Sequence, residues 1–323
     1  AILINASSVG MSPHEEGCLV PDVSYFHPEL IVSDVIYQPR KTRLLQMAES
    51  VGCPTFNGMY MLLYQGAYAF ELWTGKPMPV ELVKNKVKTI RLEVSQKEYD
   101  GESHNVIAGL PGKREEFIVL TAHYDSTSLS HGAYDNMSGC AGLLGIMEAM
   151  KDKELNYGLR FVFCGSEERG LLGSKAYVRD HEKELEKVAL NINLDMIGTY
   201  MGKFISCVSA EEKLAGYISY MAAEVGFPVE ARAGVYSSDS TPFADKGVPS
   251  LSFARIASKN VAPIHCRYDL KEVMSMEQLQ KDIDFLAKFT ERFANAVVCP
   301  VSREIPEKIK KELDEYLFRK RKE

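Results

Sequence analysis

The feature that most constrains the fold is a series of short, continuous apolar runs separated by segments with helical periodicity. The runs lie at residues 117–122, 159–164, 190–194 and 249–253. Runs of this length are typical of strands that are buried on both faces of a parallel sheet. Further strands are expected at 87–95 and 104–110, and helices at 138–150, 170–181, 211–225 and 277–298. Strands that alternate with helices predict an α/β fold with a largely parallel sheet.

The first 86 residues show a different pattern of apolar and polar residues. Strand-like runs are expected at 1–4 and 30–37, and helices at 42–50 and 58–73. A break dense in Gly and Pro follows at residues 74–79. We therefore predict a boundary near Asn85, which gives an N-terminal segment (1–86) and a main domain (87–300). Residues 301–323 carry Lys and Glu in mixed order and predict a solvated, charged helix.

Composition excludes several classes of protein. The 323 residues include 38 Lys and Arg against 44 Asp and Glu, a net charge of −6, which argues against nucleic-acid or anionic-membrane partners. No apolar run reaches the length of about 18 residues that a transmembrane helix needs. The seven cysteines never form a C-x-x-C pair. That pattern argues against a disulfide scaffold and favours a reducing, cytoplasmic compartment.

Histidines and carboxylates gather at the ends of the predicted buried strands. In open α/β sheets, ligands bind beyond the carboxyl ends of the strands. One further carboxylate, Asp135, lies in a loop just before a helix. The residues that follow the strands are His123, Asp125, Glu167, Glu168, Asp195 and His265.

These side chains suit a metal centre. Imidazole and carboxylate ligands favour zinc, and two metal ions held close together need a shared carboxylate. Asp125 and Asp269 follow His123 and His265 closely enough to accept the hydrogen bond from each histidine's second ring nitrogen. Adjacent carboxylates on an extended backbone point in different directions. One of the Glu167–Glu168 pair can then bind metal while the other acts as a general base.

Residues 87–300 resemble the M28 family of zinc metallopeptidases. The motifs that carry the resemblance are AHYDS (122–126), GAYDNMSG (132–139), SEERGLLGS (166–174), NLDMIG (193–198), SDSTPF (238–243) and IHCRYD (264–269). The resemblance implies a three-layer α/β/α sandwich of the zinc aminopeptidase type. It also implies that every expected ligand and the general base are present.

The same resemblance implies a role for each residue. Asp135 would bridge two zinc ions, which Co²⁺ or Mn²⁺ could replace. Glu168 and His265 would complete one site, and His123 and Asp195 the other.

Glu167 would be the general base, and Asp125 would support His123. The family often has a histidine where this chain has Ser240. In the same loop, Tyr236 and Asp239 are candidates for substrate contact.

Residues 1–86 resemble the C-terminal part of shikimate dehydrogenases. The matching segments are INASSVGM (4–11), residues 32–42, and residues 58–75, which end in FELWTG. The chain has no G-x-G-x-x-G after a strand, so it lacks the cradle for a dinucleotide pyrophosphate. The catalytic Lys and Asp of that family would precede residue 1. We therefore expect no cofactor binding here, and packing to be the role of this segment.

The sequence thus predicts a metallopeptidase with two zinc ions that releases N-terminal amino acids from peptide substrates. In this hypothesis metal-bound hydroxide attacks the scissile carbonyl and Glu167 transfers the proton. One alternative is a glutaminyl-cyclase-like acyltransferase that uses a single zinc ion. A second is a non-catalytic binding module of the same fold, and a third is an incomplete NADP-dependent shikimate dehydrogenase.

Overall fold

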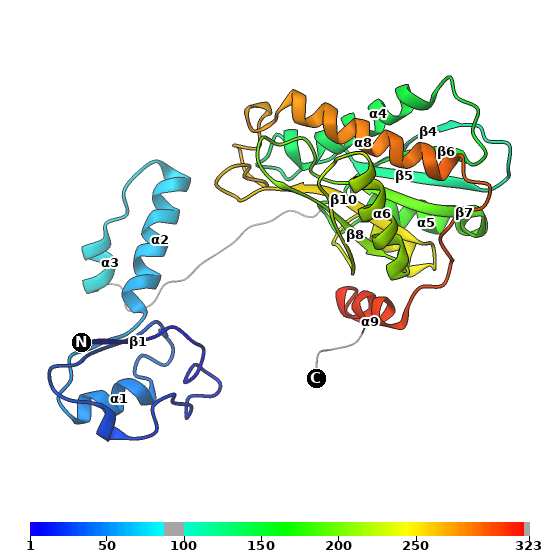
Figure 1. Ribbon diagram of the computed structural model, residues 1–323. Helices are drawn as coiled ribbons and strands as arrows, with labels where there is room; N and C mark the ends of the chain where they lie inside the picture. Colours follow the sequence, from blue (N-terminus) through cyan, green and yellow to red (C-terminus); the bar gives the residue numbers. More distant parts are fainter. Residues whose placement is uncertain (87–99, 320–323) are drawn as a thin grey trace. The chain divides into compact units, whose positions relative to one another are not determined.

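The chain forms two compact units, residues 1–98 and 99–323, which are described separately. The computed structural model describes residues 1–86 and 100–319 (Figure 1). The strand expected at 87–95 lies outside the described residues. Among the described helices, none combines the length and apolar character that crossing a bilayer requires.

The N-terminal unit is a small parallel sheet with one packed helix. Its strands are β1 (Ile2–Asn5), β2 (Ile31–Asp34) and β3 (Thr55–Phe56), and β2 lies in the middle. Helix α1 (Arg43–Ser50) begins where Thr42 caps it by accepting a hydrogen bond from the Leu45 amide. Apolar residues of α1 and β2 form a small core of their own.

Two further helices complete this unit, α2 (Met59–Thr74) and α3 (Val80–Lys86). Helix α2 buries none of its residues, although most of them are apolar; Trp73, for example, is 84% exposed. The helices predicted at 42–50 and 58–73 are therefore present, and the second leaves most of its apolar side chains exposed.

The second unit is built on a seven-stranded mixed sheet in the order β4-β6-β5-β7-β10-β8-β9. The strands β6, β5, β7 and β10 run parallel to one another. Strand β4 pairs antiparallel with β6 and β8 pairs antiparallel with β10, whereas β9 pairs parallel with β8. The bounds are β4 (Val106–Leu110), β5 (Phe117–His123), β6 (Gly158–Cys164), β7 (Val188–Leu194), β8 (Lys203–Ser209), β9 (Glu230–Ala233) and β10 (Ser250–Ile256).

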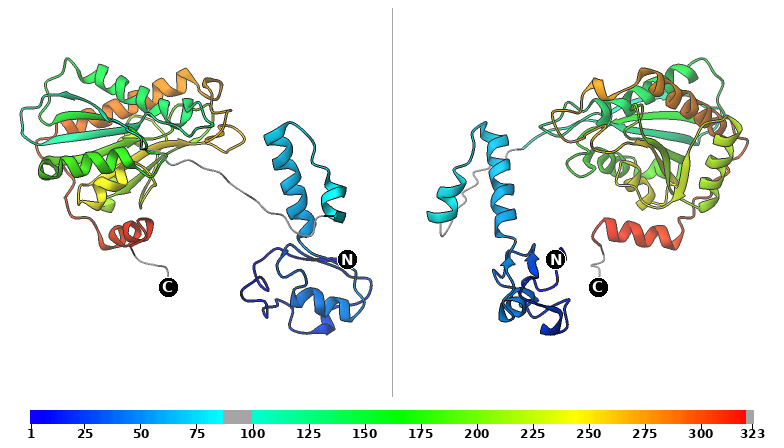
Figure 2. Two further views of the ribbon diagram at one scale, coloured as in Figure 1. Left: turned by 180° about the vertical axis from the view of Figure 1, so that it is seen from behind. Right: turned by 60° about the vertical axis from the view of Figure 1, so that its left-hand side comes forward.

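Helices cover both faces of this sheet and make a three-layer α/β/α sandwich, as predicted. The main core lies between the sheet and α4, α6 and α8, and a smaller core lies under α5 and α7. Figure 2 shows α4 and α8 together on one face. The bounds are α4 (Ser138–Met150), α5 (Leu172–Asp180), α6 (Glu212–Glu224), α7 (Ser240–Asp245), α8 (Met276–Ala294) and α9 (Glu307–Tyr316).

Alternation along the strands explains the two cores. Ile118 and Leu120 of β5 belong to the larger core, and Val119 between them belongs to the smaller one. Successive side chains of a strand point to opposite faces, so a continuous apolar run fills both layers.

The structure departs from the predicted elements in several places, and the short elements β3, α3 and α7 were not predicted at all. Helix α8 ends at Ala294 and not at residue 298, because the Ala294 carbonyl accepts hydrogen bonds from the amides of Asn156 and Tyr157. The strands β8 and β9 were missed. Polar residues interrupt β8 (KFISCVS) and β9 (EARA), so neither has the continuous apolar run that identified the central strands.

Candidate metal centre

Two groups of metal-ligand side chains lie beyond the carboxyl ends of the central strands. One group is His123, Asp135 and Asp195, and the other is Asp135, Glu168 and His265. Within each group the ligand atoms all lie within 4.8 Å of one another. The structure therefore brings together the five residues that the sequence predicted as ligands, and Asp135 belongs to both groups.

The carboxylate of Asp135 faces both histidines. Its Oδ1 lies 3.3 Å from Nε2 of His123, and its Oδ2 lies 3.0 Å from Nε2 of His265. Nε2 of His265 also lies 3.1 Å from Oε2 of Glu168, and Nε2 of His123 lies 3.6 Å from Oδ1 of Asp195. One oxygen toward each histidine is the arrangement expected of a carboxylate shared between two cations.

Unpartnered polar atoms indicate that this centre fits metal ions. Oε1 of Glu168 and Oδ1 of Asp195 are buried and make no hydrogen bond with the described residues. Burial raises the pKa of Asp195, and the charge of Asp135 adds to this effect. Burial alone would lower the pKa of His123, but neighbouring carboxylates raise it. Mixed imidazole and carboxylate donors at this spacing suit zinc.

An unusual backbone conformation recurs in and beside the ligand-bearing loops. Ser166, Leu171, Met196 and His265 have φ between 58° and 60°, a left-handed conformation that residues other than glycine rarely adopt. Such residues cluster at functional sites, where the surrounding fold holds them in place.

Asp125 holds the loop that carries the two glutamates. Its Oδ1 accepts a hydrogen bond from the Glu167 amide at 2.9 Å, and its Oδ2 accepts one from the Glu168 amide at 3.2 Å. Nδ1 of His123 lies closer to the Asp125 carbonyl oxygen, at 3.1 Å, than to the carboxylate, at 3.7 Å. The expected support of His123 thus comes from the backbone of Asp125.

Asp269 does the same for the loop that carries Asp135. Its carboxylate accepts hydrogen bonds from the amides of Tyr134, at 2.7 Å, and Asp135, at 3.1 Å. The expectation that Asp269 would support His265 was wrong. Each of these two aspartates fixes a ligand-bearing loop through two successive amides.

Replacing Asp269 with asparagine should weaken zinc binding by about 10–100-fold, the usual effect of losing an outer partner of a ligand. The NH2 group of the asparagine side chain would face one of the two backbone amides that now donate to Asp269, and two donors cannot bond to each other. The Asp135 loop would therefore lose one of its two hydrogen bonds. Zinc titration against a chromophoric chelator measures this change. Asp284→Asn, at an exposed position on α8, is the matched control. Equal zinc affinity in both variants would show that Asp269 does not position the loop.

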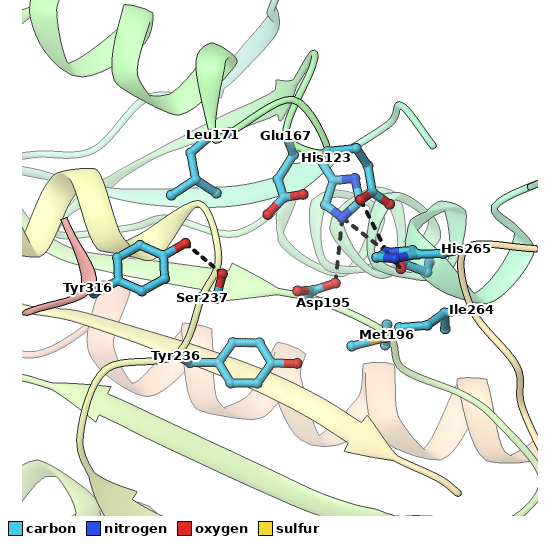
Figure 3. Close-up of a pocket in the computed structure, with 13 residues that line it drawn as sticks. His123, Glu167, Leu171, Asp195, Met196, Tyr236, Ser237, Ile264, His265 and Tyr316 are labelled. Carbon is cyan, nitrogen blue, oxygen red and sulfur yellow. Dashed lines mark hydrogen bonds and ion pairs between the residues drawn. The ribbon is translucent and has the colours of Figure 1, made fainter. Parts of the chain in front are cut away.

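Glu167 is not part of either ligand group and lines a pocket of about 310 Å³ beside them. Burial raises the pKa of its carboxyl to about 8, against the opposing effect of His123. A carboxyl with a pKa near neutrality can both accept and return a proton. Figure 3 shows its carboxylate pointing into the open space of the pocket.

The two substrate-contact candidates differ in their positions. Tyr236 is half-buried and lines the pocket. Asp239 is only 1% exposed and is not among the lining residues, so it does not reach the pocket in this structure. Burial raises its pKa to about 6. Ser240 stands where the family that the sequence resembles often has a histidine. It is buried, and its hydroxyl forms a hydrogen bond with that of Ser252.

Sequence reasoning missed other residues of the pocket wall. Ser237 lies next to Tyr236, and Tyr316 comes from α9, a helix to which the sequence assigned no function. The Ser237 and Tyr316 hydroxyl oxygens are 2.6 Å apart. Neither carries a motif, and only the tertiary packing of α9 brings Tyr316 to the site.

Comparison with known proteins agrees with this geometry. The profile of "Peptidase family M28" matches residues 105–290, more than half of the chain. The chain therefore belongs to peptidase family M28. That segment contains both ligand groups and Glu167.

Among solved structures, the chain resembles a zinc aminopeptidase from Bacillus subtilis, with 30% identity and a TM-score of 0.54. The match covers 62% of this chain and 53% of the Bacillus enzyme. An aminopeptidase from Aneurinibacillus sp. strain AM-1 matches with 20% identity and a TM-score of 0.56, over 84% of this chain and 65% of that one. The second likeness shows the fold alone.

The N-terminal unit has a separate relationship. Residues 58–88 match "Shikimate 5'-dehydrogenase C-terminal domain". A shikimate dehydrogenase (NADP(+)) from Alkaliphilus metalliredigens is 53% identical over 83 residues, which are 26% of this chain. The chain spans only 29% of the length of that relative. It therefore contains a shikimate dehydrogenase C-terminal segment followed by an M28 peptidase domain.

Proposed function

We propose that this protein is a metallopeptidase with two zinc ions that releases N-terminal amino acids from peptides. The observation that carries the proposal is the position of Asp135, whose two oxygens face His123 and His265. A carboxylate shared in this way, with an acidic residue beside it that binds no metal, suits metal-assisted hydrolysis of an amide bond.

His123 and Asp195 would hold one ion, Glu168 and His265 the other, and Asp135 both. When bound, the ions supply the positive charge that activates water and polarises the scissile carbonyl. Co²⁺ or Mn²⁺ could occupy the same donors. Asp125 and Asp269 hold the ligand-bearing loops in place through hydrogen bonds to their amides before the substrate arrives. The site therefore needs little reorganisation.

The chain's own residues perform the proton transfer. Glu167 takes a proton from the attacking water and later gives it to the leaving amine. Burial raises its pKa to about 8, so the ionised form that accepts the proton and the neutral form that returns it are both accessible near neutral pH. Tyr236 lies on the pocket wall and can donate its hydroxyl hydrogen to the scissile carbonyl oxygen. Burial and the nearby Asp195 charge raise the pKa of Tyr236, so it remains a donor at neutral pH.

The proposed activity is tested on a panel of aminoacyl chromogenic amides, after chelation and after zinc is added back. We expect chelation to abolish amino-acid release and zinc to restore it. Blocking the α-amino group of the same substrates should prevent cleavage, since an aminopeptidase recognises a free N-terminus. Release that persists without metal would contradict the proposal, and so would equal cleavage of blocked and free substrates.

One alternative remains testable beside it. A cyclase-type acyltransferase would use a single zinc ion, whereas both ligand groups are complete here. Ammonia release from N-terminal glutamine peptides, without amino-acid release from the panel, would favour the cyclase. For the N-terminal unit we propose no catalytic role, and titration with NADP⁺ should show no binding.

A further inference from the structure

A side chain from outside the family segment forms part of the pocket wall. The match to family M28 ends at residue 290, and Tyr316 stands at the end of α9. Tyr316 is half-buried, lines the pocket and has its hydroxyl 2.6 Å from that of Ser237. In Figure 3 the tyrosine lies with Leu171 on the side of the pocket opposite His265.

Packing fixes the apolar face of α9. Ile309 and Leu313 are buried and form a cluster with Ala244 of α7. Oε2 of Glu312 accepts a hydrogen bond from the Val235 amide at 3.2 Å. Helix α9 is therefore attached to the loop that carries Tyr236 and Ser237 and to α7, which follows that loop.

An ion pair fixes the far end of the same segment. The guanidinium of Arg319 binds both oxygens of Asp245, at 2.6 and 2.7 Å. A two-pronged pair of this kind adds geometric definition as well as attraction. Tyr316 thus lies between two anchors, the buried leucine and isoleucine on one side and Arg319 on the other.

The wall near Tyr316 is uncharged. The charged residues that line the pocket are Glu167 and the members of the two ligand groups. The opposite side offers the ring of Tyr316, the Leu171 side chain and the Ser237 hydroxyl. The volume of about 310 Å³ includes the space beside the two ligand groups, so only part of it is left at the end that Tyr316 and Leu171 line. This uncharged end is suited to an apolar side chain, and the ring of Tyr316 limits its depth.

We infer that Tyr316 is a specificity-determining residue that closes the end of the pocket and limits the substrate's terminal side chain to compact apolar ones such as leucine. The inference rests on the proposed function, and it names the substrate class for that site. Ser237 holds the tyrosine hydroxyl and so keeps the ring in place.

The test compares Tyr316→Ala with Tyr316→Phe on leucine and tryptophan amides. Loss of the ring should raise the tryptophan-to-leucine ratio of kcat/KM by roughly tenfold or more, since one methylene in such a pocket already changes this ratio about 10-fold. Tyr316→Phe keeps the ring and should stay within about threefold of the wild type. Arg319→Ala, which releases one anchor, should shift the ratio in the same direction but by less.

Tyr220→Ala is the matched control, because Tyr220 is exposed on α6 and does not line this pocket. Zinc content should be unchanged in all variants, and thermal unfolding should show that each variant is folded at the assay temperature. An unchanged ratio in Tyr316→Ala, in a folded and zinc-loaded protein, would overturn the inference.

A second readout separates this inference from the proposed function. Calorimetry measures the binding of free leucine and free tryptophan to the zinc-loaded protein. If the wild type hydrolyses none of the amides, the proposed function fails. A shift toward tryptophan in Tyr316→Ala would still support the role of Tyr316. No shift, or no binding of either amino acid, would overturn it.

Discussion

Replacing Glu167 with glutamine should lower kcat by about 10²–10⁴-fold and leave the zinc content unchanged. The amide has nearly the shape of the carboxyl but cannot accept a proton from water. Glu167 lies in neither ligand group, so metal binding does not depend on it. Steady-state kinetics on an aminoacyl amide, with elemental analysis of the same sample, measures both quantities.

Glu315→Gln is the control for this substitution, because Glu315 is exposed on α9. It makes the same chemical change away from the pocket and should leave kcat unaltered. Near-normal turnover in Glu167→Gln would show that another group moves the proton. Loss of zinc in that variant would instead place Glu167 among the ligands.

Replacing Asp135 with alanine should abolish activity and remove both metal ions. The two ligand groups share this carboxylate, so its loss leaves each with only two of its three residues. It also removes one of the two carboxylates that face Nε2 of His123 and one of the two that face Nε2 of His265. Zinc content by elemental analysis and residual hydrolysis are the measurements.

Asp284→Ala, at an exposed position on α8, controls for the general effect of removing an aspartate. Circular dichroism should show that Asp135→Ala remains folded, because Asp135 is not part of the main core. Full zinc occupancy in folded Asp135→Ala would rule out the bridging role.

Much of this site could be predicted because the chemistry follows the strands. Continuous apolar runs identified β5, β6, β7 and β10, and parallel strands place their carboxyl ends at one edge. His123 is the last residue of β5, Asp195 directly follows β7, and Glu168 lies in the loop after β6. The positions of the ligands were therefore constrained by the order of elements, without any knowledge of the loops.

The loop contacts could not be predicted in the same way. Asp269 binds the Asp135 amide across 134 residues of sequence, and Asp125 binds the Glu167 amide across 42. Because each aspartate lies close in sequence to a histidine, the sequence predicted a hydrogen bond between the two. The backbone amides of a distant loop were the stronger partners, because a carboxylate can satisfy two successive donors there.

The pocket wall was hidden for a related reason. The charged sequence of α9 indicates a solvated helix. Within it, Ile309 and Leu313 are the apolar residues that pack against α7. Which side chain then reaches the pocket depends on the helix rotation. The strands β8 and β9 were not predicted because neither contains a continuous apolar run. They are defined by the pairing of β8 with β10 and of β9 with β8.

The most direct test of the account is the zinc stoichiometry of the purified, dialysed protein, measured by elemental analysis against protein concentration. Asp135 belongs to both ligand groups, so we predict two zinc ions per chain. Binding of one ion or none, in a folded protein supplied with excess zinc before dialysis, would contradict a centre that holds two metal ions.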